Sequence, residues 1–144
     1  MNTRELRIGN WVYAPTKCDY IPARIVNLGE KTWMGRTIDG KYIDGLHDVE
    51  FDTLKSIKPI ELTEQMLCNN GFEYVGEHEF DQRRCFLRYG GGDCIMIYCT
   101  PNHTDFRMTI RKDSTEISEF PCQYLHELQN LYYEINKKEL DFKF

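Results

Sequence analysis

The chain has no long hydrophobic run, and this absence excludes a membrane helix. None of its windows approaches the roughly 18 consecutive apolar residues that such a helix needs. The first residues, Met1 to Glu5, are mostly polar or charged and lack the apolar core of a signal peptide. These two absences predict a cytoplasmic protein.

An excess of positive charge is also missing. The 144 residues include 18 Lys and Arg against 23 Asp and Glu, which gives a net charge of -5. Residues 1–60 hold nine basic and eight acidic residues, whereas residues 61–144 hold nine and fifteen. Nucleic-acid-binding domains usually show a clear basic excess, so neither half is expected to bind nucleic acid through its overall charge.

The six cysteines do not form a recognisable disulfide or zinc framework. A cytoplasmic chain keeps its cysteines as thiols, and most of these lie beside apolar residues, as expected for small core side chains. The best metal pattern is Cys94-x4-Cys99-x3-His103. Residues 94 and 99 of one strand face opposite sides of a sheet, so their thiols cannot converge on one ion. We predict no metal site and no cofactor.

Short strand-like segments fill the first part of the chain. They are separated by glycine-containing turn signals and include no helical pattern, and they cover residues 6–13, 23–28, 32–38 and 48–51. Several short strands at this spacing predict a small SH3-like β-barrel in residues 1–60.

The remaining residues, 61–144, combine helices with strands. Thr63 is a suitable N-cap for a helix over Glu64–Asn70, and Gly71 suits its C-terminal end. Strands are expected at residues 72–75, 84–89, 94–100 and 106–112, followed by a helix over residues 121–136. The fold class is therefore predicted as α+β, with an antiparallel C-terminal sheet covered by two helices.

The last helix has two distinct faces. Its apolar stripe contains Tyr124, Leu125, Leu128, Leu131, Tyr132 and Ile135, and this stripe predicts a core helix. The opposite stripe contains His126, Gln129, Asn130 and Tyr133. Two interpretations of this second stripe are open, namely a solvated face or a docking face for a partner or a second subunit.

The faces of the sheet follow from an assumed strand register. If Tyr89 pairs with Cys94, and Thr100 with Phe106, the two faces differ strongly in character. Leu87, Met96, Tyr98, Phe106, Met108 and Ile110 then share the face that receives the helices, and the other face carries Arg84, Phe86, Arg88, Arg107 and Arg111. Such an arginine face suits phosphate groups and base stacking, although pairing of the arginines with nearby glutamates is the commoner explanation of such a pattern.

Two further candidate sites involve aromatic and cysteine residues. Trp11, Tyr13, Trp33 and Tyr42 line a peptide groove in one interpretation and form barrel core or the interface between the two halves in the other. A Cys/His hydrolase or transferase would need Cys99 or Cys122 beside His103 or His126. No catalytic residue is assigned.

Three stretches together resemble a known group of proteins. They are ELRIGNWV at Glu5–Val12, PIELTEQMLCNNGFE at Pro59–Glu73 and LHELQNLYYEINKKEL at Leu125–Leu140. In order and spacing they resemble small uncharacterised proteins of Bacteroides-type gut bacteria and their phages. Asn136-Lys137-Lys138 departs from the Thr-Gly of that group, so the turn after the helix is expected at a left-handed Asn136.

The resemblance implies a bacterial or phage origin and transfers no activity. We therefore expect a non-catalytic binding protein, such as an accessory protein of a phage or mobile element, with a protein partner or self-association. Nucleic-acid binding through the arginine face and a small Cys/His enzyme are the alternatives.

Overall fold

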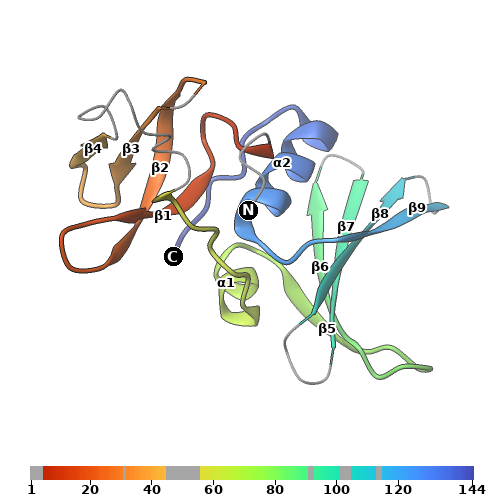
Figure 1. Cartoon of the computed structure of the whole chain (residues 1–144). Coiled ribbons are helices and arrows are strands. Elements are labelled where there is room, and N and C mark those ends of the chain that lie inside the picture. The colour runs from red at the N-terminus through yellow and green to blue at the C-terminus, as the bar shows by residue number, and fades with distance from the viewer. Residues whose placement is uncertain (1–4, 31, 45–55, 91–92, 101–104, 113–114) are drawn as a thin grey trace. The chain divides into compact units, whose positions relative to one another are not determined.

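Two antiparallel sheets and two helices make up the part of the chain that the computed structural model describes, which is residues 5–30, 32–44, 56–90, 93–100, 105–112 and 115–144. The α+β class is confirmed. The chain divides into two compact units (Figure 1). Unit 1 comprises Met1–Ile60 and Tyr124–Leu131, and unit 2 comprises Glu61–Gln123 and Tyr132–Phe144. The sequence predicted one boundary, between residues 60 and 61. It did not predict that residues 124–131 belong to the first unit.

Unit 1 contains a four-stranded antiparallel sheet in the order β1-β2-β3-β4. Its strands are β1 (Trp11–Pro15), β2 (Tyr20–Leu28), β3 (Trp33–Thr37) and β4 (Tyr42–Asp44). An isolated antiparallel bridge joins Tyr13 of β1 to Lys58. The described residues form no closed barrel. β4 was not among the predicted strands, and the strand predicted at residues 48–51 falls outside the described residues.

The core of unit 1 follows the alternation of side chains along its strands. Val12 and Ala14 of β1, with Ala23 and Ile25 of β2, are completely buried. Trp33 joins the same core cluster, together with Leu6 and Ile57. Because successive side chains of a strand point to opposite faces, Trp11 and Tyr13 lie on the other face of this sheet.

Unit 2 begins with a short helix, α1 (Glu64–Asn69), at the position expected from sequence. The Thr63 side chain accepts a hydrogen bond from the Met66 N–H, which confirms the N-cap, and Gly71 has a φ of +82°. A five-stranded antiparallel meander follows, in the order β5-β6-β7-β8-β9. Its strands are β5 (Glu73–Glu77), β6 (Arg84–Gly90), β7 (Asp93–Cys99), β8 (Phe106–Lys112) and β9 (Thr115–Pro121). The sequence did not predict β9.

The register of β8 differs from the prediction by one residue. Tyr89 pairs with Cys94 as expected, but Phe106 pairs with Cys99 rather than with Thr100. A shift of one residue moves every side chain of a strand to the other face. The buried face of the sheet therefore contains Phe86, Ile95, Ile97, Cys99, Phe106, Met108 and Ile110, whereas Leu87, Met96 and Tyr98 lie on the opposite face.

The last helix, α2 (Leu125–Asn136), starts four residues later than predicted because β9 extends to Pro121. Leu125 and Leu128 are fully buried, as predicted for a core helix. His126 and Gln129 are also buried, at 1% and 0% exposure, so the predicted docking face is wrong for these two residues. Tyr133 is half-buried, and the left-handed residue after the helix is Lys137 (φ +52°), not Asn136.

No helix in the described ranges is both long and apolar enough to cross a membrane.

Candidate functional site

A pocket of about 340 Å³ lies beside the β5–β6 hairpin of unit 2. Val75, Gly76, Glu77, His78, Glu79, Phe80, Cys85, Met96 and Tyr98 line it, and we call it the hairpin pocket. Its floor is the sheet face opposite the buried one, because Cys85 and Tyr98 are cross-strand partners on that face. A bulge between Tyr74 and Gly76 interrupts the pairing of β5, and Gly76 has a φ of +115°, which only glycine adopts readily.

The tip of the hairpin carries the most exposed large hydrophobic side chain that the structure describes. Phe80 is 90% exposed, and its ring centroid lies 5.9 Å from that of His78. His78 also meets the Tyr98 ring edge-on at 6.1 Å. The hairpin is closed by a 2.8 Å hydrogen bond from the His78 N–H to the Arg83 carbonyl. Three neighbouring rings, those of His78, Phe80 and Tyr98, therefore line the hairpin pocket.

Ion pairs hold the charged side chains near this pocket. Arg83 Nε lies 2.6 Å from an Asp81 carboxylate oxygen, and the guanidinium also pairs with Glu119. The Arg83 guanidinium lies 4.5 Å above the Tyr98 ring. Burial acts to raise the pKa of Asp81, but hydrogen bonds from Arg83 outweigh it and hold this pKa below its ordinary value. Asp81 therefore stays ionised at neutral pH, and Glu77 and Glu79 add exposed carboxylates.

The predicted arginine face is not formed. Arg84 and Arg88 lie on the same face as the buried residues, whereas Arg107 lies on the opposite face, because of the one-residue difference in register. Arg111 shares the face of Arg107 by its strand position, but its side chain is outside the described part of the structure. Phe86 is only 1% exposed, so it is not available to stack on a base.

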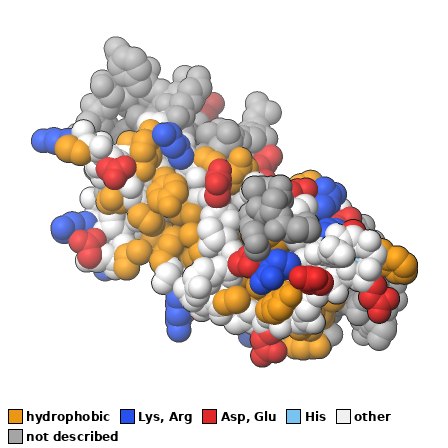
Figure 2. Space-filling view, turned by 90° about the horizontal axis from the view of Figure 1, so that it is seen from below, with side chains coloured by type: hydrophobic (Ala, Val, Ile, Leu, Met, Phe, Trp, Pro, Cys, Tyr) orange, Lys and Arg blue, Asp and Glu red, His pale blue; other side chains and the backbone are white. Residues whose placement is uncertain are grey.

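The described arginines of this sheet pair with neighbours in unit 2. Arg84 Nε lies 2.7 Å from a Glu64 carboxylate oxygen, and Arg107 Nε lies 3.4 Å from Glu119. Arg88 donates a hydrogen bond to the Asn70 carbonyl. Figure 2 shows a face of the molecule on which acidic and basic side chains are interspersed among hydrophobic ones. Local pairing, the alternative that the sequence left open, therefore accounts for these arginines.

The predicted aromatic groove is divided between two faces of the unit 1 sheet. Trp33 is 2% exposed and belongs to the core, so it cannot contact a partner. Trp11 and Tyr42 lie on the other face, in one cross-strand row with Arg24 and Arg36. Tyr42 is 65% exposed, and the Arg36 guanidinium lies 5.6 Å from the centre of its ring.

The polar stripe of α2 binds the N-terminal segment of the same unit. Gln129 Oε1 accepts a 2.9 Å hydrogen bond from the Trp11 N–H, and Gln129 Nε2 donates to the Gly9 carbonyl at 3.1 Å. Asn130 Oδ1 accepts a 2.9 Å hydrogen bond from Asn10 Nδ2. Gln129 and Asn130 therefore bind residues of their own unit, whereas one of the two interpretations of the sequence had them bind an external partner.

Of the two thiols that the enzyme alternative offers, that of Cys99 is not activated. Burial raises the pKa of Cys99 to about 11, and burial also raises the pKa of Cys85. The nucleophilic form of cysteine is the thiolate, which these values disfavour. Cys122 is 1% exposed, and His103 lies outside the described residues. The geometry thus gives no support to Cys99 as a nucleophile.

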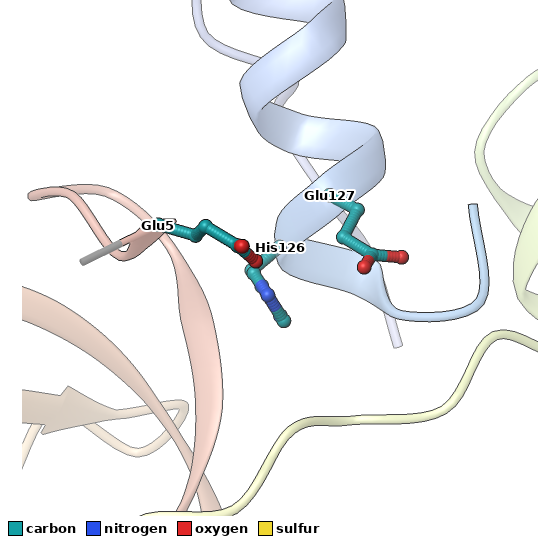
Figure 3. Close-up of side chains that lie close together, drawn as sticks. All are labelled: Glu5, His126 and Glu127. Carbon is teal, nitrogen blue, oxygen red and sulfur yellow. The ribbon is translucent and has the colours of Figure 1, made fainter. Parts of the chain in front are cut away.

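One cluster of potential ligands was missed in the sequence. Glu5 comes from the N-terminal segment, and His126 and Glu127 come from the first turn of α2 (Figure 3). Burial lowers the pKa of His126, although both glutamates act to raise it. More than 100 residues separate Glu5 from the other two along the chain, so no local motif announces this cluster.

Comparisons with known proteins found no matching family model, no matching curated protein and no matching solved structure.

Proposed function

We propose that this protein binds a partner protein without catalysing a reaction, and that the hairpin pocket is its contact site. The observation that carries this proposal is the 90% exposure of Phe80 beside an open pocket. An aromatic ring that stays in water contributes nothing to the core, whereas aromatic residues at the centre of an interface supply much of the binding energy.

The chemistry around the hairpin pocket favours one kind of occupant. Met96 and Phe80 offer apolar and aromatic surface, and Glu77 and Glu79 add negative charge to the lining. Aromatic faces and carboxylates both attract cations. The expected partner segment therefore presents an apolar side chain next to a lysine or arginine.

Selection from a displayed library of random peptides tests this proposal. Peptides selected on the intact protein should share an apolar residue beside a basic one. Phe80→Ala should weaken their binding at least about tenfold, as measured by isothermal titration calorimetry, because truncation of a residue that dominates an interface costs about 2 kcal/mol or more. Tyr89→Ala is the matched control, since Tyr89 is 77% exposed and does not line the pocket. Equal binding by all three proteins would contradict the proposal.

A second candidate contact surface is the outer face of the unit 1 sheet. We infer that this unit is an SH3-like module, an architecture in which the last strand lies beside the first. The inference is supported by the Tyr13–Lys58 bridge and by the bulge in β2 between Ile25 and Asn27. SH3-like domains bind extended peptides on aromatic surfaces, and the row containing Trp11 and Tyr42 provides such a surface. Loss of peptide binding in Tyr42→Ala but not in Phe80→Ala would move the contact site to this face.

The biological setting belongs to the same proposal. The order of the three sequence stretches supports a bacterial or phage origin, and the expected role is that of a cytoplasmic accessory protein of a phage or mobile element that engages a host protein. Self-association is the other possible partnership. Sedimentation velocity over a range of concentrations separates the two, because only self-association changes the mass of the purified protein.

A further inference from the structure

We propose that Glu5, His126 and Glu127 form a binding site for a divalent transition-metal ion, with Zn²⁺ as its representative. The inference is independent of the hairpin pocket, because all three residues belong to unit 1. One nitrogen or oxygen atom from each residue lies within 4.8 Å of the corresponding atoms of the other two. One imidazole and two carboxylates are a ligand set that zinc accepts.

Hydrogen bonds outside the cluster position both carboxylate residues. Asn130 Nδ2 donates a 2.6 Å hydrogen bond to the Glu5 carbonyl, which fixes the Glu5 backbone against α2. Glu127 Oε2 accepts a 3.0 Å hydrogen bond from the Tyr124 N–H at the start of the same helix. A carboxylate has enough lone pairs to accept this bond and to bind an ion. The backbone of the site is therefore preorganised.

His126 supplies a second, independent observation. Its side chain is 1% exposed, yet neither ring nitrogen has a hydrogen-bond partner among the described residues. A buried polar atom without a partner is costly, and most such atoms in folded proteins are satisfied. The Tyr124 ring lies nearly parallel to the imidazole, at an interplanar angle of 10° and a centroid distance of 5.9 Å. Coordination to an ion would satisfy one of the two nitrogens.

The distances fit an ion after a small closure of the side chains. Ligand atoms around tetrahedral zinc lie about 3.4 Å apart, given zinc–ligand distances of about 2.1 Å. The present separations, up to 4.8 Å, exceed this value by an amount that rotation of the flexible glutamate side chains can remove. Glu5 is exposed, so water can enter and complete the coordination shell. The bound ion would join the N-terminal segment to α2.

Metal titration of the intact protein tests the site. Exposed Cys18 and Cys68 are competing ligands, so the experiment uses a Cys18→Ser, Cys68→Ser background. Isothermal titration calorimetry with Zn²⁺ should give one ion per chain, and the melting temperature should rise with the Zn²⁺ concentration. Glu5→Gln should weaken Zn²⁺ binding at least about tenfold, since even outer-sphere substitutions at metal sites cost about 10–100-fold. This variant changes an exposed side chain and is expected to fold.

Two control variants and a Co²⁺ absorption spectrum test whether the ion binds at these three residues. His78→Gln and Glu134→Gln remove a histidine and a carboxylate outside the cluster and should leave Zn²⁺ binding unchanged. Co²⁺ bound at the proposed site should show no sulfur-to-metal charge-transfer band, because all three ligands are nitrogen or oxygen. The proposal would be overturned by an absence of stoichiometric binding, by equal affinity in Glu5→Gln, or by a thiolate band, which would place the ion on a cysteine.

Discussion

Single side chains in this protein show how little residue type reveals about exposure. Gln129 is completely buried because its amide group binds two backbone groups of the N-terminal segment, the Trp11 N–H and the Gly9 carbonyl. Phe80 is the opposite case, since it is apolar and 90% exposed. A buried amide with satisfied hydrogen bonds is stable, whereas an exposed aromatic ring usually indicates a contact surface.

The six thiols should differ widely in reactivity. At pH 8 a thiol with a pKa of about 11 is ionised in roughly one molecule in a thousand, and Cys99 is in addition completely buried. Cys18 and Cys68 are exposed. Short treatment with iodoacetamide should therefore label Cys18 and Cys68 at least about 100-fold faster than Cys99, because only the thiolate reacts. Peptide mass spectrometry after quenching measures the rates.

Denatured protein provides the control for thiol labelling. In guanidinium chloride all six cysteines should react at similar rates, because burial no longer raises any pKa. Rapid labelling of Cys99 in the folded protein would show that its strand opens readily or that its thiol is activated, and the Cys/His enzyme alternative would then gain support.

Among the strands and helices, neighbouring elements decide both position and orientation. β9 occupies residues that the sequence pattern assigned to a loop and to the start of a helix, so α2 begins at Leu125. β8 has the predicted bounds, yet pairing Phe106 with Cys99 places its apolar side chains on the same face as Ile95 and Ile97, not on the face of Met96 and Tyr98. The bounds of β8 followed from its local sequence, whereas its register depends on the partner strand.

Replacement of Leu128 tests α2 as a core helix. Leu128→Ala should lower the free energy of unfolding by about 2–5 kcal/mol, because Leu128 is completely buried and its truncation leaves a cavity. Glu134→Ala, on the exposed side of the same helix, should change it by less than about 0.5 kcal/mol. Urea denaturation followed by circular dichroism measures both values. A loss below about 1 kcal/mol for Leu128→Ala would show that this side chain is not part of a packed core.

The chain as a whole forms two units that are not simply consecutive in sequence. Unit 1 takes its strands from Met1–Ile60 and completes itself with Tyr124–Leu131, the first half of α2. The polar atoms of Gln129 and Asn130 pair with Gly9, Asn10 and Trp11, which makes the helix a structural part of this unit.

A fragment of residues 1–60 should therefore not fold stably by itself. It lacks the hydrogen-bond partners of Asn10 Nδ2 and of the Trp11 N–H, and unpaired buried polar groups are destabilising. Its amide NMR spectrum should show poor dispersion, and a peptide of residues 121–140 should restore dispersion on addition. The control peptide carries Gln129→Ala and Asn130→Ala, and it should not restore the dispersion. A well-dispersed spectrum of the fragment alone would contradict this prediction.

Much of the fold was accessible from sequence because its signals are local. Thr63 and Gly71 mark the ends of α1, and both act as the sequence indicated. Tyr89 pairs with Cys94, as the short glycine-rich connection in the sequence predicted. The separation of Cys94 and Cys99 onto opposite faces was also correct, because side chains alternate along any strand. Caps, tight turns and alternation depend only on residues close in the chain.

The candidate sites depend on contacts between residues that are distant in sequence. Only the tertiary structure therefore determined which residues form them. A one-residue difference at Phe106 divided the predicted arginine face, and the N-terminal segment covered the helix stripe predicted to dock a partner. The hairpin pocket and the cluster of Glu5, His126 and Glu127 appear only after folding. Local periodicity identifies which side of a helix or strand is polar, but only long-range packing determines whether that side meets water, another segment or a ligand.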